Sequence, residues 1–326
     1  MLSTPASAFL SAHALRLAVL VAAVAIPTTA CKGGAAHKDQ GHASGSAGSV
    51  GSASGAPAQA APDPERAENA KLEAAIECLN SNSERVFEVR DGYLADVDPA
   101  TGVPLRAGPM NLMGLGSAEP CERKVKAAAA LTPAIPELDK ASADYVAALA
   151  GFRAVWDQLD AYYKKGEHLD DKAARARELH PKVMAAVDGF AAANAALHRA
   201  VEDRNRRRHQ AALAALEQRE GRNLEVIIGT LMLEAQTLLG LTEAPAIDAA
   251  ALAAQLTTYG ALVDEVDAYA GAHADEAARW GSLTNVRNYS KAFLAASKAV
   301  GRDGTPASRD EAMRQYNFLV DNFNNH

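Results

Sequence analysis

Apolar residues recur at helical spacing from about residue 65 to the end of the chain. Of all the sequence features, this pattern most restricts the folds that the chain can adopt. The clearest stripe of large side chains lies in residues 137–165 and consists of Leu138, Tyr145, Leu149, Phe152, Trp156, Leu159, Tyr162 and Tyr163. Their spacing places most of them on one face of a helix, where they would fill a core. No convincing alternation of apolar and polar residues indicates a strand. The sequence therefore predicts an all-α fold, an antiparallel multi-helix bundle.

Prolines and glycines divide this region into segments. The expected helices cover 65–93, 137–165, 170–221, 224–240, 247–270, 282–300 and the stretch from 305 onward. Pro181 marks either a kink or a fresh start within the third of them, because proline cannot donate to the helical ladder. Four prolines and four glycines in residues 98–120 predict a long irregular loop. The helices would form one domain of about 260 residues or two tightly joined halves.

Composition and charge exclude one class of function. The chain carries 33 Lys and Arg against 40 Asp and Glu, a formal net charge of −7. A nucleic-acid surface needs a net basic face, so we expect no nucleic-acid partner. No nucleotide-binding, catalytic-triad or zinc pattern is present, and the sequence supplies no reason to expect a cofactor.

The N-terminus resembles an export signal. Residues 17–26 read LAVLVAAVAI and follow Arg16. Ten helical residues rise only about 15 Å, half the thickness of a bilayer core, which is typical of a signal peptide and too short for a membrane span. We expect no later segment to be long and apolar enough to cross a membrane.

A cysteine follows this apolar stretch in a context of small residues, Pro27-Thr28-Thr29-Ala30-Cys31. The arrangement resembles the bacterial lipoprotein signal, which implies removal of residues 1–30 and lipidation of Cys31. Ordinary secretory cleavage is the alternative, because residues 28–30 also pass as a small-x-small cleavage site. Lys32 fits the sorting rule for the outer membrane. The expected location is the bacterial cell envelope, with a lipid anchor in the membrane, on the periplasmic side of the outer membrane.

Gly, Ala, Ser and Pro dominate the segment that follows the cysteine. Such a composition buries too little apolar surface to offset the entropy of ordering, which predicts a disordered linker. The expected organisation is a signal peptide over residues 1–30, a lipid-anchored linker over 31–65 and an α-helical domain over 66–326.

Three short motifs in the helical region carry a family resemblance. The central one comprises Tyr162-Tyr163-Lys164-Lys165, Asp170-Asp171-Lys172, Glu178-Leu179-His180-Pro181-Lys182 and Phe190. Ile76-Glu77-Cys78-Leu79-Asn80 precedes it, and Tyr316-Asn317-Phe318-Leu319-Val320-Asp321-Asn322-Phe323-Asn324 follows it. In this order they resemble the YiiG-like family of helical bacterial lipoproteins of uncharacterised function. The resemblance implies an all-helical envelope domain and supplies no catalytic residue.

Two cysteines lie beyond the signal, Cys78 and Cys121. In an oxidising compartment they are expected to pair and to tie the first helix to the segment after the loop. Closing about 44 residues in this way is worth about 4 kcal/mol in the chain-entropy model. The alternative is two unpaired buried thiols.

Two polar clusters are candidate metal sites. Residues 271–276 read G-x-H-x-x-E, which resembles a metal-associated motif of the imelysin-like periplasmic proteins; His273 and Glu276 would share a helix face and supply half a site. The other cluster contains His168, Asp170, Asp171 and His180. The alternative for His273 is a solvated surface position. For the second cluster it is an aspartate that caps a helix, with both histidines at the surface.

Two further groups of charges lie in residues 198–208. His198 and Glu202, four residues apart, are expected to form an ordinary surface pair. The arginines at 204, 206, 207 and 208 could grip a lipid phosphate or an anionic cell-wall polymer. The alternative is a solvated helix whose arginines pair with acids of the same helix.

These observations favour a periplasmic binding or scaffolding module without catalytic activity, with an envelope protein or a cell-wall component as partner. The alternative function is a metal-binding or small-ligand-binding helical bundle of the imelysin-like kind, a class that could include an enzyme.

Overall fold

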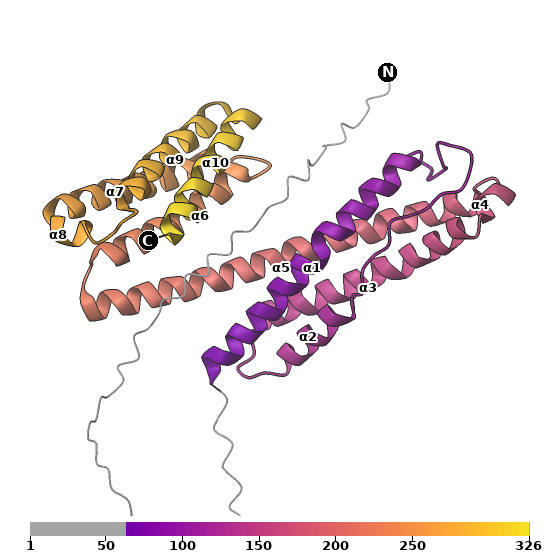
Figure 1. Cartoon of the computed structure of the whole chain (residues 1–326), viewed down its shortest axis with the longest axis horizontal. Coiled ribbons are helices and arrows are strands. Elements are labelled where there is room, and N and C mark those ends of the chain that lie inside the picture. Colours follow the sequence, from indigo (N-terminus) through magenta and orange to yellow (C-terminus); the bar gives the residue numbers. More distant parts are fainter. Residues whose placement is uncertain (1–62, 326) are drawn as a thin grey trace, which may run out of the picture.

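The structure, a computed structural model, describes residues 63–325; the predicted signal peptide, Cys31 and most of the predicted linker lie outside the described residues. The described part is helical, apart from loops and one isolated bridge between Val97 and Pro104. Its helices are α1 (Pro64–Asp96), α2 (Glu119–Ala129), α3 (Pro136–Lys164), α4 (Glu167–Asp170), α5 (Ala174–Glu220), α6 (Leu224–Glu243), α7 (Ala249–Ala272), α8 (Ala274–Ala277), α9 (Leu283–Asp303) and α10 (Pro306–Asn324). This confirms the predicted all-α class (Figure 1).

The helices bury two separate apolar clusters, which divide the fold into two lobes. The N-terminal lobe, residues 64–201, consists of α1 to α4 and the first part of α5, and its core contains Tyr145, Phe152, Trp156 and Phe190. The C-terminal lobe, residues 224–324, consists of α6 to α10 around a core that includes Tyr259 and Phe293. Of the two alternatives left open by the sequence, this arrangement matches two joined halves.

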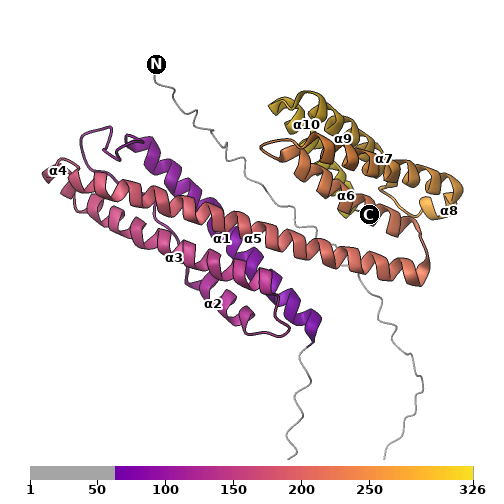
Figure 2. The same ribbon diagram turned by 180° about the vertical axis from the view of Figure 1, so that it is seen from behind.

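Helix α5 runs from one lobe to the other (Figures 1 and 2). Its 47 residues correspond to a length of about 70 Å. Pro181 lies inside the helix, so it does not mark a fresh start. The predicted start at Asp170 is also wrong: α4 ends there, and Lys172 and Ala173 take left-handed backbone angles before α5 begins at Ala174.

Helix ends carry the side chains that satisfy their free amide groups. At four N-termini the side-chain oxygen of the N-cap residue itself accepts a hydrogen bond from the first turn, namely at Asp63, Asn223, Asp248 and Thr305. Positive-φ glycines end α5 and α9, at Gly221 and Gly304. These capping residues define the ends of the helices, which the periodicity alone locates only to within a few residues.

Helix α6 corrects the expectation that no later segment is apolar enough to span a membrane. By length and composition, it is the one such helix in the described part of the chain. In the structure 44% of its most apolar stretch is buried against the rest of the protein, with Ile228, Leu231 and Leu238 in the core of the C-terminal lobe. A core helix of a folded domain meets the same two criteria.

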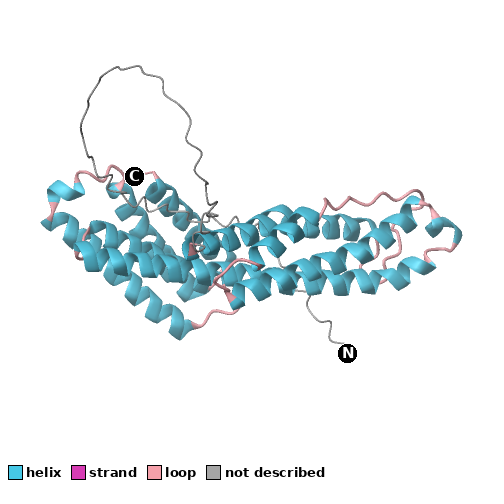
Figure 3. Ribbon diagram, turned by 90° about the horizontal axis from the view of Figure 1, so that it is seen from below, coloured by secondary structure: helices cyan, strands magenta, loops and turns pink. Residues whose placement is uncertain are grey.

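The predicted loop lies between α1 and α2 and runs along the N-terminal lobe; Figure 3 shows it among the loops drawn in pink. Side chains of the lobe hold it. Arg85 donates two hydrogen bonds to the Gly114 carbonyl oxygen, at 3.0 and 2.6 Å, and the Trp156 indole donates to that of Met113. Although it lacks regular structure, the loop is thus tied to α1 and α3.

Candidate functional site

Cys78 of α1 and Cys121 of α2 form a disulfide, with Cα atoms 5.0 Å apart. Both residues are buried at the edge of the N-terminal core. The pairing is the one expected from the sequence, and it ties the short α2 to the first helix. The alternative of two unpaired thiols is not what the structure contains.

His180 lies on α5 and is 4% exposed. Its Nε2 is 3.0 Å from the Pro99 carbonyl oxygen, which can only accept, so Nε2 carries the proton. Its Nδ1 is 2.9 Å from the Tyr93 hydroxyl, within hydrogen-bond distance. Burial, followed by the neighbouring Tyr163, raises the pKa of Tyr93. Both nitrogens of His180 are thus used to fasten the loop and α1 to α5.

His168 lies on α4 and is also buried, and its Nε2 donates to the Gly108 carbonyl oxygen at 2.9 Å. Asp171 follows α4 and accepts hydrogen bonds from the Tyr162 hydroxyl and from the amides of Ala174 and Arg175. Burial opposes the charged form of Asp171, but these hydrogen bonds outweigh it and lower its pKa. Asp171 therefore caps the start of α5, as the capping alternative predicts.

The capping alternative is wrong about the histidines, because it places both at the surface. His168 and His180 are buried where the loop docks on α4 and α5, and neither contacts the Asp170 carboxylate through a described hydrogen bond. The local sequence carries no signal for this burial, since it depends on loop residues that lie 60 and 81 positions away along the chain.

His273 and Glu276 do not share a helix face, which corrects the motif-based expectation. His273 lies at the break between α7 and α8, is exposed, and stacks on Tyr269 with ring centroids 4.0 Å apart. The Glu276 carboxylate instead accepts from the Leu224 amide at 3.2 Å and from the Tyr269 hydroxyl at 2.9 Å. It thereby caps the start of α6. Among residues 63–325, no group of three or more His, Cys, Asp or Glu side chains could hold a metal ion.

Two arginines of the 204–208 cluster on α5 pair with an acid on another helix. Arg204 forms two hydrogen bonds to the Glu68 carboxylate of α1, at 2.8 and 2.5 Å, and Arg208 approaches the same carboxylate at 3.3 Å. Arg206 pairs with Asp203 of its own helix. The expectation that all partners lie on the same helix is therefore wrong for Arg204 and Arg208, and the cluster joins α5 to the first turns of α1.

His198 and Glu202 are half-buried, so they are not the surface pair that was predicted. Burial lowers the pKa of His198. Burial likewise raises the pKa of Glu202, against the attraction of Arg206. Burial raises the pKa of Tyr316 on α10 to about 12, and the negative charge of Glu202 contributes to this rise. This part of α5 thus lies at the junction of the two lobes.

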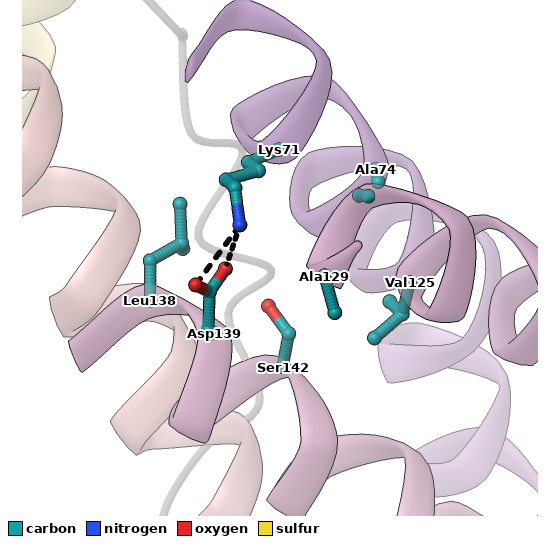
Figure 4. A pocket seen from close by; sticks show the side chains of 8 residues that line it. Lys71, Ala74, Val125, Ala129, Leu138, Asp139 and Ser142 are labelled. Atoms are coloured by element: carbon teal, nitrogen blue, oxygen red, sulfur yellow. Dashed lines mark hydrogen bonds and ion pairs between the residues drawn. The ribbon is translucent and has the colours of Figure 1, made fainter. Parts of the chain in front are cut away.

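One charged group lies within the N-terminal lobe and was not found from the sequence. Lys71 of α1 is 2% exposed, and its Nζ lies 2.7 and 2.9 Å from the two carboxylate oxygens of Asp139 on α3. Figure 4 shows the pair beside Ser142, Leu138 and the end of α2. The space enclosed there is only about 10 Å³, enough for about one water molecule and too small for a ligand.

A larger hollow lies between α1, the end of the loop and α3, with a volume of about 490 Å³. Its walls are Ser81, Asn82, Arg85 and Val86 of α1, residues 114–118 of the loop, and Leu149 and Arg153 of α3. We refer to it as the arginine cleft. Arg153 donates to the Gly116 carbonyl oxygen, just as Arg85 donates to that of Gly114. Sequence reasoning missed the cleft, because its residues come from three separate segments without a motif.

The fold and these contacts define a class: an all-helical protein of two bundles joined by one long helix, with a disulfide in the first bundle. Comparison with known proteins identifies the family. The chain belongs to the family described as "Protein of unknown function (DUF3829)", whose pattern matches residues 66–325. This bears out the resemblance carried by the three motifs.

The chain is similar to the uncharacterised protein YiiG of Escherichia coli strain K12, with 26% identity over 226 residues. The match covers 63% of this chain and 62% of the relative, so the chain matches less than two thirds of that protein's length. No solved structure matches the chain.

Proposed function

We propose that the chain is an exported cell-envelope lipoprotein, anchored through Cys31 on the periplasmic side of the outer membrane. Its helical domain acts there as a binding or scaffolding module without catalysis, and its partner is an envelope protein or a cell-wall component.

The observation that carries the scaffolding role is the sharing of α5 by two separately packed lobes. A continuous helix of about 70 Å joins the two bundles, since its first part completes the N-terminal core and its later part packs beside α6 of the C-terminal lobe. Such a shape suits a module that contacts two partners, or one extended partner, at once. The polar clusters of the described residues fasten the loop and the helix ends, which is a structural role.

The disulfide supports the proposal of export. Disulfides persist in oxidising compartments such as the bacterial periplasm and are rare in a reducing cytosol. Cys78 and Cys121 are both buried and are paired with each other. The disulfide therefore fits a chain that folds outside the cytoplasm.

Cell fractionation tests the anchor. In cells that make the full chain, the protein should sediment with the membranes and incorporate an alkyne-labelled fatty acid. Cys31→Ala should lose the label and appear in the soluble periplasmic fraction, whereas the Cys78→Ala/Cys121→Ala variant should keep the label. Persistent membrane partitioning and labelling of Cys31→Ala would refute the anchor.

Crosslinking in intact cells tests the binding role. Photoreactive residues at exposed positions in each lobe, Ala154 on α3 and Asp321 on α10, report on the two lobes. Discrete adducts with an envelope protein or with cell-wall material, weakened in the Cys31→Ala variant, are expected. If neither position gives an adduct above the level seen without light, the proposed scaffolding role is wrong.

A further inference from the structure

The arginine cleft has the size of a small-molecule site. Its volume is about 490 Å³, whereas pockets that bind small ligands are typically about 300–1,000 Å³. The cavity beside Lys71 is far smaller. Size alone identifies no ligand, so the chemistry of the walls has to decide what could bind.

The charge of the cleft is opposite to that of the whole chain. Two arginines line it and no aspartate or glutamate does, although the chain has a net charge of −7. The nearest acidic partners are Glu88, 3.2 Å from Arg85, and Asp157, 3.7 Å from Arg153. Both carboxylates belong to well-exposed side chains and are absent from the walls of the cleft. Positive charge therefore dominates inside it.

Both guanidinium groups are held in place by the loop. Arg85 uses Nε and Nη2 on the Gly114 carbonyl oxygen, and Arg153 uses Nη1 on that of Gly116. A guanidinium has five N–H donors in a fixed fork, so donors remain on each group even after these bonds and the contacts of Arg85 with Glu88 and of Arg153 with Asp157. Two such groups, on neighbouring helices and oriented before a ligand arrives, form a receptor suited to oxyanions.

The remaining walls combine one more donor with an apolar surface. Ser117 Oγ accepts a hydrogen bond from the Glu119 amide at 3.3 Å, which leaves its hydroxyl proton free to point at a ligand. Val86 and Leu149, both buried, supply an apolar floor, and Leu115 and Ala118 add to it. A ligand that fits this cleft would carry a charged head and a short apolar body.

We propose that the arginine cleft binds a small ligand whose oxyanion, a carboxylate or a phosphate, contacts Arg85 and Arg153 while its apolar part lies on Val86 and Leu149. This inference rests on the proposed binding role and names a ligand class for it. The membrane anchor plays no part in it.

Calorimetric titration of the purified full chain, with a detergent-only blank, tests the ligand class. The probes are hexanoate, hexyl phosphate and the neutral hexanamide. At least one anion is expected to bind tenfold or more tightly than hexanamide, and the tighter of the two tells carboxylate from phosphate. If both anions fail to bind at millimolar concentrations, or bind no better than hexanamide, the proposal is wrong.

Substitutions locate the binding site. Arg153→Gln should weaken binding of the preferred anion tenfold or more, and Arg153→Lys should restore part of the loss because it keeps the charge. The matched control is Arg123→Gln on α2, a well-exposed arginine outside the cleft, which should bind like the unmodified chain. Equal losses in Arg123→Gln and Arg153→Gln would indicate a general charge effect and overturn the assignment.

A second variant blocks the cleft and keeps both arginines. Ser81 is an exposed wall residue of α1, and an indole in its place would occupy part of the volume. Ser81→Trp should therefore abolish binding while the melting temperature and the disulfide stay unchanged. Undiminished binding by Ser81→Trp would overturn the site. Crosslinked partners without any anion binding would leave the scaffolding role standing and refute only the ligand.

Discussion

Lys71 and Asp139 form an ion pair in the N-terminal lobe, in which the Lys71 side chain is 1% exposed and the Asp139 side chain 22%. Removal of one charge from such a pair leaves the other poorly solvated, which costs more than the pair contributes as a whole. Asp139 keeps one other hydrogen bond, from the Ile135 amide at 2.9 Å. The pair is therefore a sensitive point of the lobe.

We expect Lys71→Met to lower the free energy of unfolding by about 3 kcal/mol, measured by urea denaturation. The matched control is Lys124→Met, because Lys124 pairs with Glu77 at an exposed site. Exposed pairs contribute at most about 1 kcal/mol. Equal losses in the two variants would contradict the importance assigned to burial.

Gly102 lets the loop pack closely against the buried rings of His180 and Tyr93. It has a φ of +69°, and a Cβ built there would lie 2.5 Å from Cβ of His180 and 2.7 Å from the Tyr93 hydroxyl. Its carbonyl oxygen also accepts a hydrogen bond from the Tyr163 hydroxyl. Burial raises the pKa of Tyr163 to about 12. Position 102 therefore needs glycine for both its backbone angle and the lack of space.

Gly102→Ala should destabilise the protein by more than the roughly 1–2 kcal/mol that left-handed backbone angles alone cost a residue with a Cβ. Gly166→Ala measures that backbone cost separately, because Gly166 has a φ of +71° and a methyl group placed there would meet no heavy atom within 4 Å. Thermal unfolding of both variants gives the comparison. If Gly102→Ala costs no more than Gly166→Ala, the close packing of the loop on His180 and Tyr93 is wrong.

His198 gives a pH dependence whose sign can be worked out. Burial lowers its pKa in the folded protein, whereas an unfolded histidine titrates near about 6.5. Below that value the unfolded state binds more protons, so stability falls as the pH falls from about 6.5 toward the folded pKa. Above the pKa of the unfolded histidine, His198 is neutral in both states and no longer makes stability depend on pH.

Between pH 7.5 and 5.5, the melting temperature of the unmodified chain should therefore drop more than that of His198→Gln. Glu202 is present in both proteins, so its contribution to the pH dependence cancels when the two melting curves are compared. Asn205→Ala, on the same helix, controls for a change at a half-buried site without a titrating group. Identical pH profiles for His198→Gln and the unmodified chain would rule out this assignment.

At the scale of helices, the spacing of apolar residues predicted the long helices well, because each of them buries one continuous stripe of apolar side chains. The expected helix at 137–165 is α3, Pro136–Lys164, and the expected start after Thr305 is α10, Pro306–Asn324. The helices missing from the prediction are α2, α4 and α8, of 11, 4 and 4 residues. Such short helices show too few repeats for a period to be recognised.

The site residues were predicted less completely, for a different reason. The disulfide could be predicted because few cysteines leave few pairings. The burial of His168 and His180 could not, since it depends on how residues 99–108 of the loop fold back. The arginine cleft likewise combines α1, the loop and α3, and such long-range proximity leaves no trace in local spacing.

The disulfide stabilises α2, a short helix with few core residues of its own. It closes a loop with a sequence separation of 43. Replacement of both cysteines by alanine should lower the free energy of unfolding by about 2–4 kcal/mol. Urea denaturation with and without a reductant measures this: the reductant should destabilise the unmodified chain and leave the double variant unaffected. A reductant effect of equal size on both proteins would mean that the disulfide is not its target.

At the scale of the whole molecule, the two cores are joined through α5 and its neighbours. Leu197 and Val201 of α5 close the N-terminal core, and the C-terminal core begins with Leu224 of α6. Between them, α5 packs beside α6, where Leu213 lies against Gly229 and Arg206 hydrogen-bonds to Thr237. Lobes with separate cores are expected to open as separate cooperative units.

Hydrogen exchange can test this independence. Phe293 is fully buried in the C-terminal core, with its ring 5.5 Å from that of Tyr259 and 5.6 Å from that of Tyr316. Phe293→Ala should cost about 3–5 kcal/mol and speed exchange in α7, α9 and α10 while α1 and α3 keep their protection.

The reciprocal variant is Phe152→Ala, because Phe152 is equally buried in the N-terminal core, 5.6 Å from the Trp156 ring. It should speed exchange in α1 and α3 and spare α9 and α10. If either variant raises exchange uniformly across both lobes, the molecule unfolds as one unit, and α5 transmits stability between the lobes instead of only connecting them.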